Sequence, residues 1–136
     1  MSVFDPIKTA MESIQYMTGK VYHAEALKNA QPPFVFWIQN TEDAEEDLNG
    51  YTELCEAGFE IHIVTRNLET LDALAAAVRS ATLALQGTVS GGFLYERIQI
   101  RQISPLINEK EVNLYRKVYS LTINYQEKNV PAVGAI

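Results

Sequence analysis

The stretch that decides the fold runs from residue 51 to residue 85 and reads YTELCEAGFEIHIVT (51–65), RN (66–67) and LETLDALAAAVRSATLAL (68–85). From Cys55 to Ile63, apolar residues occupy every second position, which predicts a strand with one buried face. After Asn67, apolar residues recur three and four apart, which predicts an amphipathic helix over 71–85. Asn67 is suited to cap the start of this helix, and Gly87 to supply a left-handed residue past its end.

Size and composition indicate one globular domain. The 136 residues are 47% hydrophobic and 21% charged, which suits a single core over residues 1–136 with a flexible tail over 127–136. The net charge of −6 and the lack of a basic cluster argue against a surface that binds nucleic acid by neutralising phosphates. Cys55 lies in a strand pattern and is expected to be a small buried hydrophobe. No stretch reads as a signal peptide or a membrane span, so we expect a protein kept in a reducing cytoplasm.

The remaining elements complete an alternation of helix and hairpin. Asp5 as N-cap, followed by Pro6, marks the start of a first helix. Asn49-Gly50 marks the turn of a hairpin whose tip is acidic. Besides the strand-helix unit, we expect a helix over 5–19 and strands over 34–39, 93–103 and 112–126. The predicted class is α+β in the order α-β-β-α-β-β, with an antiparallel four-stranded sheet and helices packed on one face.

The alternation also divides the strands into a covered face and an open face. Two helices, each about 10 Å wide, cover roughly one face of a four-stranded sheet about 19 Å across. The strand over 34–39 is apolar on both sides, so it is either covered twice or meets a partner. The open face can stay in water or form a subunit contact. It is predicted to carry Glu60, His62, Arg97, Gln99 and Arg101.

No constellation of residues indicates catalysis, a metal site or a cofactor. Glu45, Asp47 and Glu56 resemble the spacing of a calcium-binding loop, but strands are predicted on both sides where that loop has helices. A solvated hairpin tip is therefore favoured. The two histidines are isolated and give no zinc site. The glycine-rich loop over 87–92 lacks a lysine and precedes a strand, so it does not read as a phosphate-binding loop.

Three segments resemble the tail-terminator, or tail-completion, proteins of long-tailed bacteriophages. They are PFVF (33–36) at the entry to the first strand, FEIHIV (59–64) leading into the second helix, and RKVYSLTI (116–123) in the last strand. The resemblance covers roughly residues 20–126 and implies an α+β fold with no catalytic residues. It also implies a homo-oligomeric ring, commonly a hexamer, that caps the tail tube and joins it to the head connector.

The implied partners are other copies of the chain, the tail tube and the head-connector proteins, with no membrane. DNA would pass through the ring without specific binding, because an acidic ring repels the phosphate backbone. The protein would be found in the virion, and in the host cytoplasm during assembly. The acidic segment over 42–47 and the extended second strand depart from the family pattern. The residues expected to contact subunits or partners are Trp37, Glu42, Asp43, Glu45, Glu46, Asp47, Tyr51, Arg97 and Arg101.

Two other functions compete with this prediction. A small-molecule-binding or regulatory α+β domain, dimeric through the open sheet face, would line a pocket with Trp37, Tyr95 and Tyr119. A metal-dependent enzyme would use Glu45, Asp47 and Glu56, and it ranks last. Ligand-induced thermal stabilisation would favour the first, and calorimetric binding of calcium or magnesium would favour the second.

Overall fold

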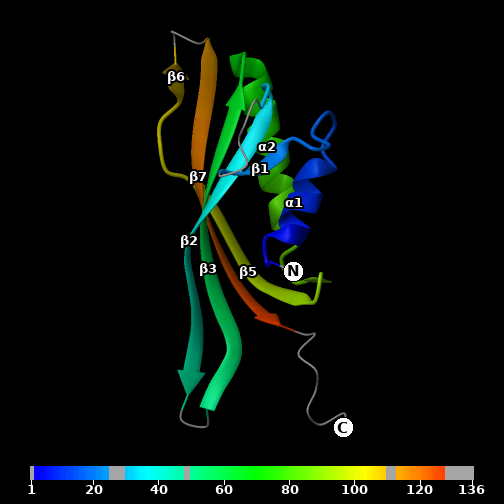
Figure 1. Cartoon of the computed structure of the whole chain (residues 1–136), viewed down its shortest axis with the longest axis vertical. Helices are drawn as coiled ribbons and strands as arrows, with labels where there is room; N and C mark the ends of the chain where they lie inside the picture. Colours follow the sequence, from blue (N-terminus) through cyan, green and yellow to red (C-terminus); the bar gives the residue numbers. More distant parts are fainter. Residues whose placement is uncertain (1, 25–29, 48–49, 110–112, 128–136) are drawn as a thin grey trace.

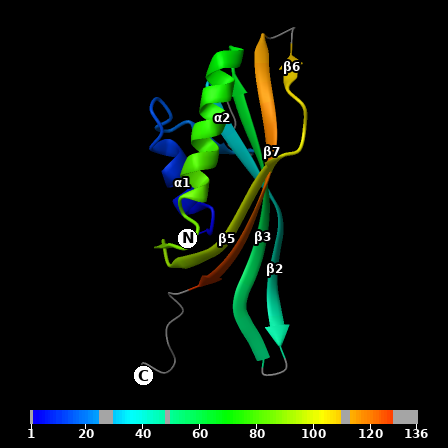
Figure 2. The same ribbon diagram turned by 180° about the vertical axis from the view of Figure 1, so that it is seen from behind.

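The described chain forms one curled sheet with its helices on the hollow side (Figures 1 and 2). The computed structural model describes residues 2–24, 30–47, 50–109 and 113–127, and over 41–54 it describes the backbone without the side chains. In chain order the elements are α1 (Asp5–Glu12), β1 (Val21–His23), β2 (Phe34–Asp47), β3 (Gly50–Thr65), α2 (Leu68–Leu83), β4 (Val89–Ser90), β5 (Phe93–Gln102), β6 (Ile107–Glu109) and β7 (Leu114–Glu127). The predicted flexible tail lies, from residue 128 on, outside the described residues.

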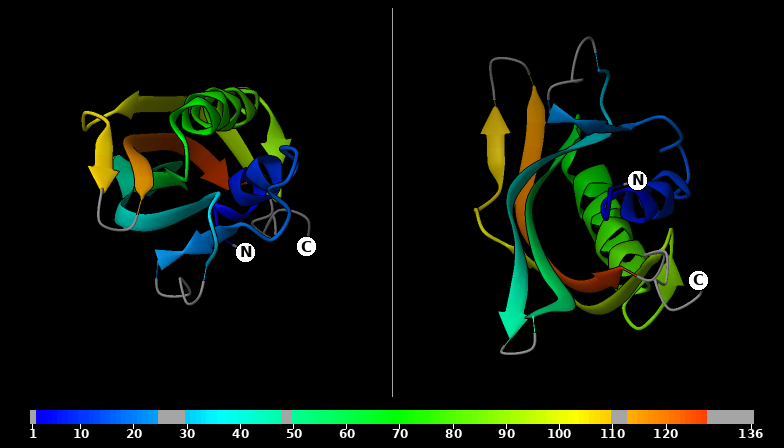
Figure 3. Two further views of the ribbon diagram at one scale, coloured as in Figure 1. Left: turned by 90° about the horizontal axis from the view of Figure 1, so that it is seen from above. Right: turned by 60° about the horizontal axis from the view of Figure 1, so that its bottom comes forward.

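The strands form a single mixed sheet. Its order is β1-β2-β3-β7-β5-β4, and β6 pairs with the start of β7. β1 runs parallel to β2, whereas the other described pairs are antiparallel. Seen from above, the sheet bends around the helices (Figure 3). We call the side that packs against the helices the inner face and the opposite side the outer face.

The predicted α+β class with an antiparallel four-stranded sheet was wrong. The structure is mostly β, and three short strands join the four long ones in a mixed, strongly curled sheet. The short strands β4 and β6 were missed because two or three residues are too few to show a period of two. The curl has a local cause in β2 and β5, where register shifts at 39/41, 44/46 and 95/97 insert extra residues that bend a strand.

The acidic stretch is strand rather than a loop at the tip. β2 continues through residues 41–47, and Asp47 pairs with Gly50 at the closed end of the hairpin. The hairpin was predicted correctly, although the turn residue Asn49 lies outside the described residues. Cross-strand pairing overrides the low strand preference of acidic residues here. We call residues 41–54 the arm, because this end of the β2–β3 hairpin extends beyond the other strands (Figures 1 and 2).

The core lies between the inner face and the two helices. α2 buries the predicted stripe of Leu71, Leu74, Ala75, Val78 and Thr82. α1 adds fully buried side chains, and the rest come from alternate positions of β3, β5 and β7. The inner-face members of this core include Val35, Ala57, Phe59, Ile61, Ile63, Tyr95, Ile98, Ile100, Tyr119, Leu121, Ile123 and Tyr125.

The first helix begins one residue earlier than predicted. Phe4 occupies the N-cap position, and Asp5 is the first helical residue, followed by Pro6. The Asp5 carboxylate still serves the helix entry, because it accepts a hydrogen bond of 2.8 Å from the backbone N–H of Ser2. The helix ends at Glu12 and not at residue 19 as predicted, because the chain leaves the helical path after Ser13, and Tyr16 has a φ of +69°. Gly19, with a φ of +70°, lies beyond it.

The predicted N-cap of the second helix is confirmed, whereas its C-cap is Ala84. Asn67 is the N-cap, and its side-chain oxygen accepts a hydrogen bond of 2.7 Å from the N–H of Thr70. Gly87 follows the helix with a φ of +82°, which a residue with a side chain rarely adopts. The junction between β3 and α2 is therefore set by local chemistry.

Replacing Asn67 with alanine is expected to lower the free energy of unfolding by about 1 kcal/mol, because the N–H of Thr70 loses its partner. Urea denaturation monitored by circular dichroism measures this loss. Asn108→Ala, at an exposed position of β6, is the matched control and should change stability by less than about 0.5 kcal/mol. Equal losses in the two variants would contradict the capping role.

Tyr95 ties the sheet to the N-terminus. Its side chain is fully buried, and its hydroxyl donates a hydrogen bond of 2.6 Å to the carbonyl oxygen of Val3. Burial, and to a lesser degree the charge of Asp5, raises the pKa of Tyr95 far above its usual range. The folded state therefore holds this phenol in its neutral form.

Tyr95→Phe is expected to lower stability at neutral pH by roughly 1 kcal/mol, since the Val3 carbonyl is left without its partner. The raised pKa of Tyr95 contributes fully to the free energy of unfolding below about pH 10, the pKa of tyrosine in the unfolded chain. This contribution is lost as the pH rises above that value. The variant should therefore lose less stability than the wild type between about pH 10 and pH 12. Urea titrations across this range test the difference. Tyr16→Phe, at a side chain that is 81% exposed, is the control and should follow the wild type.

Candidate functional site

One edge of the sheet is left without a strand partner at β5. β7 pairs with one side of β5, and β4 covers the other side at Phe93 and Leu94. Next along this side, the backbone of Tyr95 bonds to the loop before β4, and the N–H of Ile98 donates 2.9 Å to the side chain of Gln86. In the part of the chain that the structure describes, no strand follows beyond this point.

The backbone of β5 therefore offers free hydrogen-bonding groups over residues 100–102. Ile98 directs its N–H away from β7, and Ile103 directs its N–H toward the carbonyl of Val118 in β7. Strand alternation then places the N–H and C=O groups of Ile100 and Gln102 on the outward side. A row of this kind is a template for another strand.

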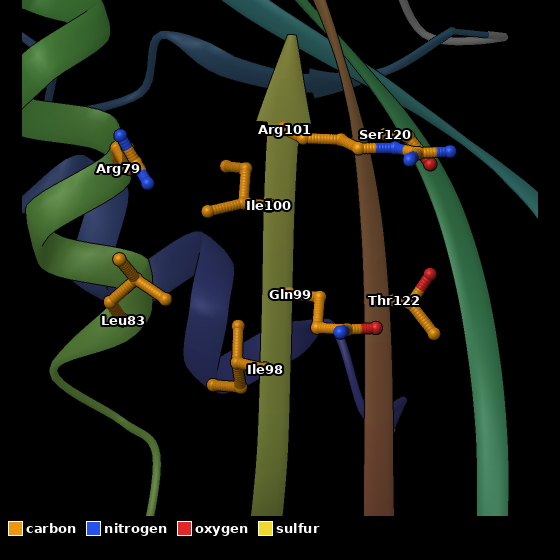
Figure 4. Close-up of a pocket in the computed structure, with 8 residues that line it drawn as sticks. All are labelled: Arg79, Leu83, Ile98, Gln99, Ile100, Arg101, Ser120 and Thr122. Carbon is orange, nitrogen blue, oxygen red and sulfur yellow. The ribbon is translucent and has the colours of Figure 1, made fainter. Parts of the chain in front are cut away.

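Two arginines flank this edge on opposite faces (Figure 4). Arg79 comes from α2 on the inner side, whereas Arg101 extends over β7 toward Ser120 on the outer side. A hollow of about 470 Å³ lies between α2 and β5 and reaches both arginines. A second hollow of about 480 Å³ also has Arg79 and Arg101 in its lining. Ile100 lines both hollows and lies on β5 between the two guanidinium groups.

The charges of these arginines are not neutralised within the described residues. Arg79 and Arg101 have no carboxylate within salt-bridge distance among the side chains described. The neighbouring Lys117 differs, because its ammonium contacts Asp72 at 2.8 Å, and this hydrogen bond raises the pKa of Lys117. Guanidinium groups stay charged at any physiological pH and bind carboxylates through paired donors. The edge therefore presents two free positive charges beside unpaired backbone groups.

The outer face carries the polar residues that were predicted for it. The strand registers place His62 opposite Val118, Glu60 and Arg101 opposite Ser120, Gln99 opposite Thr122 and Arg97 opposite Asn124. All of them lie on the face opposite the core, although Val118 is buried there. His62 and Glu60 also contact each other, with 2.5 Å between Nε2 and Oε1. The period of two was sufficient to find this face, and the contact roles predicted for Arg97 and Arg101 stay predictions.

Near β1 the same outer face is aromatic. Phe36 stacks on His62 with ring centroids 4.3 Å apart, and Tyr22 meets Phe34 edge to face at 6.2 Å. Ile38 continues this strip and is 38% exposed. The strand over 34–39 is thus apolar on both sides, as predicted. Its outer side is largely covered, because Phe34 is 8% exposed and the His62 side chain stacked on Phe36 is 12% exposed.

Trp37 and the two predicted pocket tyrosines lie apart. Trp37 is half-buried on the inner side, where it stacks on Phe4 with ring centroids 4.2 Å apart. Tyr95 is buried against the N-terminus, as described above, and Tyr119 lines the second hollow. Trp37 therefore packs the core around α1, which does not suit the partner contact predicted for it.

The acidic contact residues all fall in the arm. Glu42, Asp43, Glu45, Glu46, Asp47 and Tyr51 lie on its paired strands, and their side chains are outside the described part of the structure. The arm contains six of the 17 acidic residues of the chain and none of its 11 lysines and arginines. Outside the arm, 11 acidic and 11 basic residues remain, so the net charge of −6 is the charge of the arm.

Two further findings concern ligands and membranes. Among the side chains that the structure describes, no three histidine, cysteine or carboxylate groups come together as metal ligands. Neither α1 nor α2 is long and apolar enough to span a membrane, and the same holds for any other helix in the described residues.

Comparison with known proteins gives a match in structure but not in sequence. No protein-family model matches the chain, and no curated protein matches it. The fold matches a virion chain. That chain belongs to a solved particle described as the virion of a native gene transfer agent, and the alignment has a TM-score of 0.52 at 17% identity. It covers 92% of this chain and 95% of the virion chain, so the two chains share a fold over nearly their whole lengths.

Sequence reasoning missed Arg79 and the free edge of β5. Arg79 lies on the exposed side of a helix, where one arginine carries no signal of its own. Arg79 becomes a candidate site residue only in the folded structure, where β5 has an unpaired edge and α2 lies beside it. Strand order cannot be read from the alternation of residues, because alternation tells faces apart and not neighbours.

Proposed function

We propose that this chain is a structural protein of a phage or phage-like virion, and that it acts as a tail terminator. In this role, copies assemble into a ring that caps the tail tube and joins it to the head connector. The observation that carries the proposal is the fold shared with a chain of the gene transfer agent virion over 92% of this protein and 95% of that chain. The resemblance of the three sequence segments to tail terminators supports the narrower role.

The surfaces suit assembly better than chemistry. The outer face exposes Ile38 at the end of its aromatic strip, and β5 leaves a charged edge without a strand partner. Exposed strand edges and apolar patches of this kind are features of surfaces that bind other proteins. We therefore propose that the protein acts without catalysis or a cofactor, through contacts with its own copies, with the tail tube and with the head connector.

The charge distribution suits a passage for DNA. Each copy carries a net charge of −6, so a ring of copies is negative overall. Negative charge repels the phosphate backbone, so DNA would pass without being held. The protein would accordingly reside in the virion after assembly in the host cytoplasm.

Size-exclusion chromatography with light scattering, followed by negative-stain imaging of the protein mixed with purified tail tubes, tests the proposal. We expect closed rings in solution and a density of matching diameter at one end of each tube. A protein that stays monomeric at high concentration and leaves the tube ends bare would overturn it. A dimer whose melting temperature rises with a small ligand would favour the small-molecule-binding alternative.

A further inference from the structure

We propose that copies of this chain join head to tail, with the outer edge of β2 in the arm of one copy added as a strand to the free edge of β5 in the next. The inference deepens the ring proposed above and rests on it. It names the two surfaces that meet, and it commits to a second copy of this chain as the occupant of the β5 edge between Arg79 and Arg101.

The first argument is that two unlike strands of the sheet, β2 and β5, each have a free edge. On the edge of β2 that faces away from β3, β1 pairs with Val35, Phe36 and Trp37. No described strand pairs with this edge from residue 38 to Asp47. The free edge of β5 covers residues 100–102. Because the two edges belong to different strands, pairing one with the other is a head-to-tail contact. Such contacts repeat from copy to copy and form a ring when the rotation closes.

The second argument is complementary charge. The arm carries six carboxylates and no positive side chain, whereas the β5 edge carries the two guanidinium groups of Arg79 and Arg101 that no described carboxylate neutralises. Carboxylate-guanidinium pairs are stronger than neutral hydrogen bonds and fix geometry as well as affinity. Oppositely charged surfaces on one chain favour contact between unlike surfaces of two copies.

The third argument is the position of the arginines on opposite faces of the edge. A strand added beside β5 directs successive side chains alternately to the inner and outer sides. Arg79 lies on the inner side of this edge, and Arg101 lies on the outer side (Figure 4). In the arm sequence EDAEED (42–47), acidic residues occur at both even and odd positions. An arm strand in either phase therefore brings carboxylates to both arginines, and the two hollows give these side chains room.

Charge reversal at the edge tests the contact. Arg79→Glu and Arg101→Glu alter exposed side chains and are each expected to weaken self-association at least ~10-fold, and together at least ~100-fold, because like charges then face each other. Arg66→Glu is the matched control, since it makes the same change at an exposed residue in the turn between β3 and α2, and it should leave the association constant unchanged. Sedimentation velocity measures association, and thermal melts verify the fold of each variant.

Charge exchange keeps the test decisive. Glu45→Lys with Glu46→Lys and Asp47→Lys should also weaken association, and combining these with Arg79→Glu and Arg101→Glu in one chain should restore it. A folded five-substitution chain that stays dissociated would overturn the proposal. An edge variant that assembles like the wild type would also overturn it. So would an edge variant that forms rings but no longer joins the virion, because the β5 edge would then bind another virion protein.

These outcomes separate the contact from the function. Rings that survive the edge substitutions would overturn the contact and leave the tail-terminator role standing. Copies that associate through the arm and the β5 edge, but never cap a tail tube, would support the contact and overturn the role. A wild-type chain that remains monomeric at high concentration would overturn both.

Discussion

Alanine in place of Phe59 is expected to lower the free energy of unfolding by about 3–5 kcal/mol. Phe59 is fully buried on β3, with its ring centroid 5.0 Å from that of Phe4 and 5.8 Å from that of Trp37. It therefore joins the sheet to α1, and its loss leaves a cavity between elements that cannot close without moving both. Such a loss is a large share of the stability of a domain of this size.

Urea denaturation gives the measurement, with Ile38→Ala as the control. Ile38 lies on the neighbouring strand with 38% of its surface exposed, so its truncation should cost less than about 1 kcal/mol. A Phe59 variant that lost as little as the control would show that the packing around Phe4 does not hold α1 to the sheet.

Shortening the arm is expected to abolish self-association while the chain still folds. Ala44 pairs with Cys55, so an Asn-Gly turn in place of residues 45–54 closes the hairpin at an existing pair. The buried positions of β3 begin at Ala57 and are retained. The change removes Glu45, Glu46, Asp47 and Glu53, together with the last three residues (45–47) of the free edge of β2.

Light scattering during size-exclusion chromatography should find this variant as a monomer with a cooperative melt. A matched variant that keeps the full arm but replaces Glu45, Glu46 and Asp47 with their amides separates charge from backbone pairing. It should associate more weakly than the wild type, and its association should depend less on salt concentration. Salt screens charge pairs, and this variant lacks three of the charges. A shortened chain that still forms rings would exclude the arm from the subunit contact.

The long elements of this fold were predictable because their local signals agree. In residues 51–85, the alternation from Cys55 to Ile63, the cap at Asn67 and the stripe from Leu71 all indicate the structure that forms. Asp5 was off by one position because Phe4 takes the cap while the Asp5 carboxylate bonds to Ser2. Local chemistry thus predicted the start of the first helix to within a residue, whereas the end predicted at residue 19 lies seven residues beyond the observed end at Glu12.

The class was not predictable because it depends on non-local pairing. β1 exists through its parallel register with Val35, Phe36 and Trp37, and nothing in Val21-Tyr22-His23 alone distinguishes it from a loop. The acidic run over 42–47 reads as a solvated tip, yet it pairs along its length with residues 50–57. In both cases the partner strand, rather than the segment itself, decides the structure.

The candidate site divides in the same way. Arg101 was placed on the open face from its alternation within β5, which is a property of one strand. Arg79 gained its role from the neighbourhood of α2 and β5, which is a property of the assembled sheet. The acidic arm was recognised as a departure from the family pattern, and its position beside an unpaired strand edge required the structure.

The short strand β1 has a mechanical consequence for any chain that docks along β2. A strand sliding along that edge toward Phe34 meets Val21–His23, whose own pairing already occupies the backbone there. β1 would therefore limit how far toward Phe34 the strand of a neighbouring copy can pair with β2. The offset between adjacent molecules in an assembly would then depend on the three residues of β1.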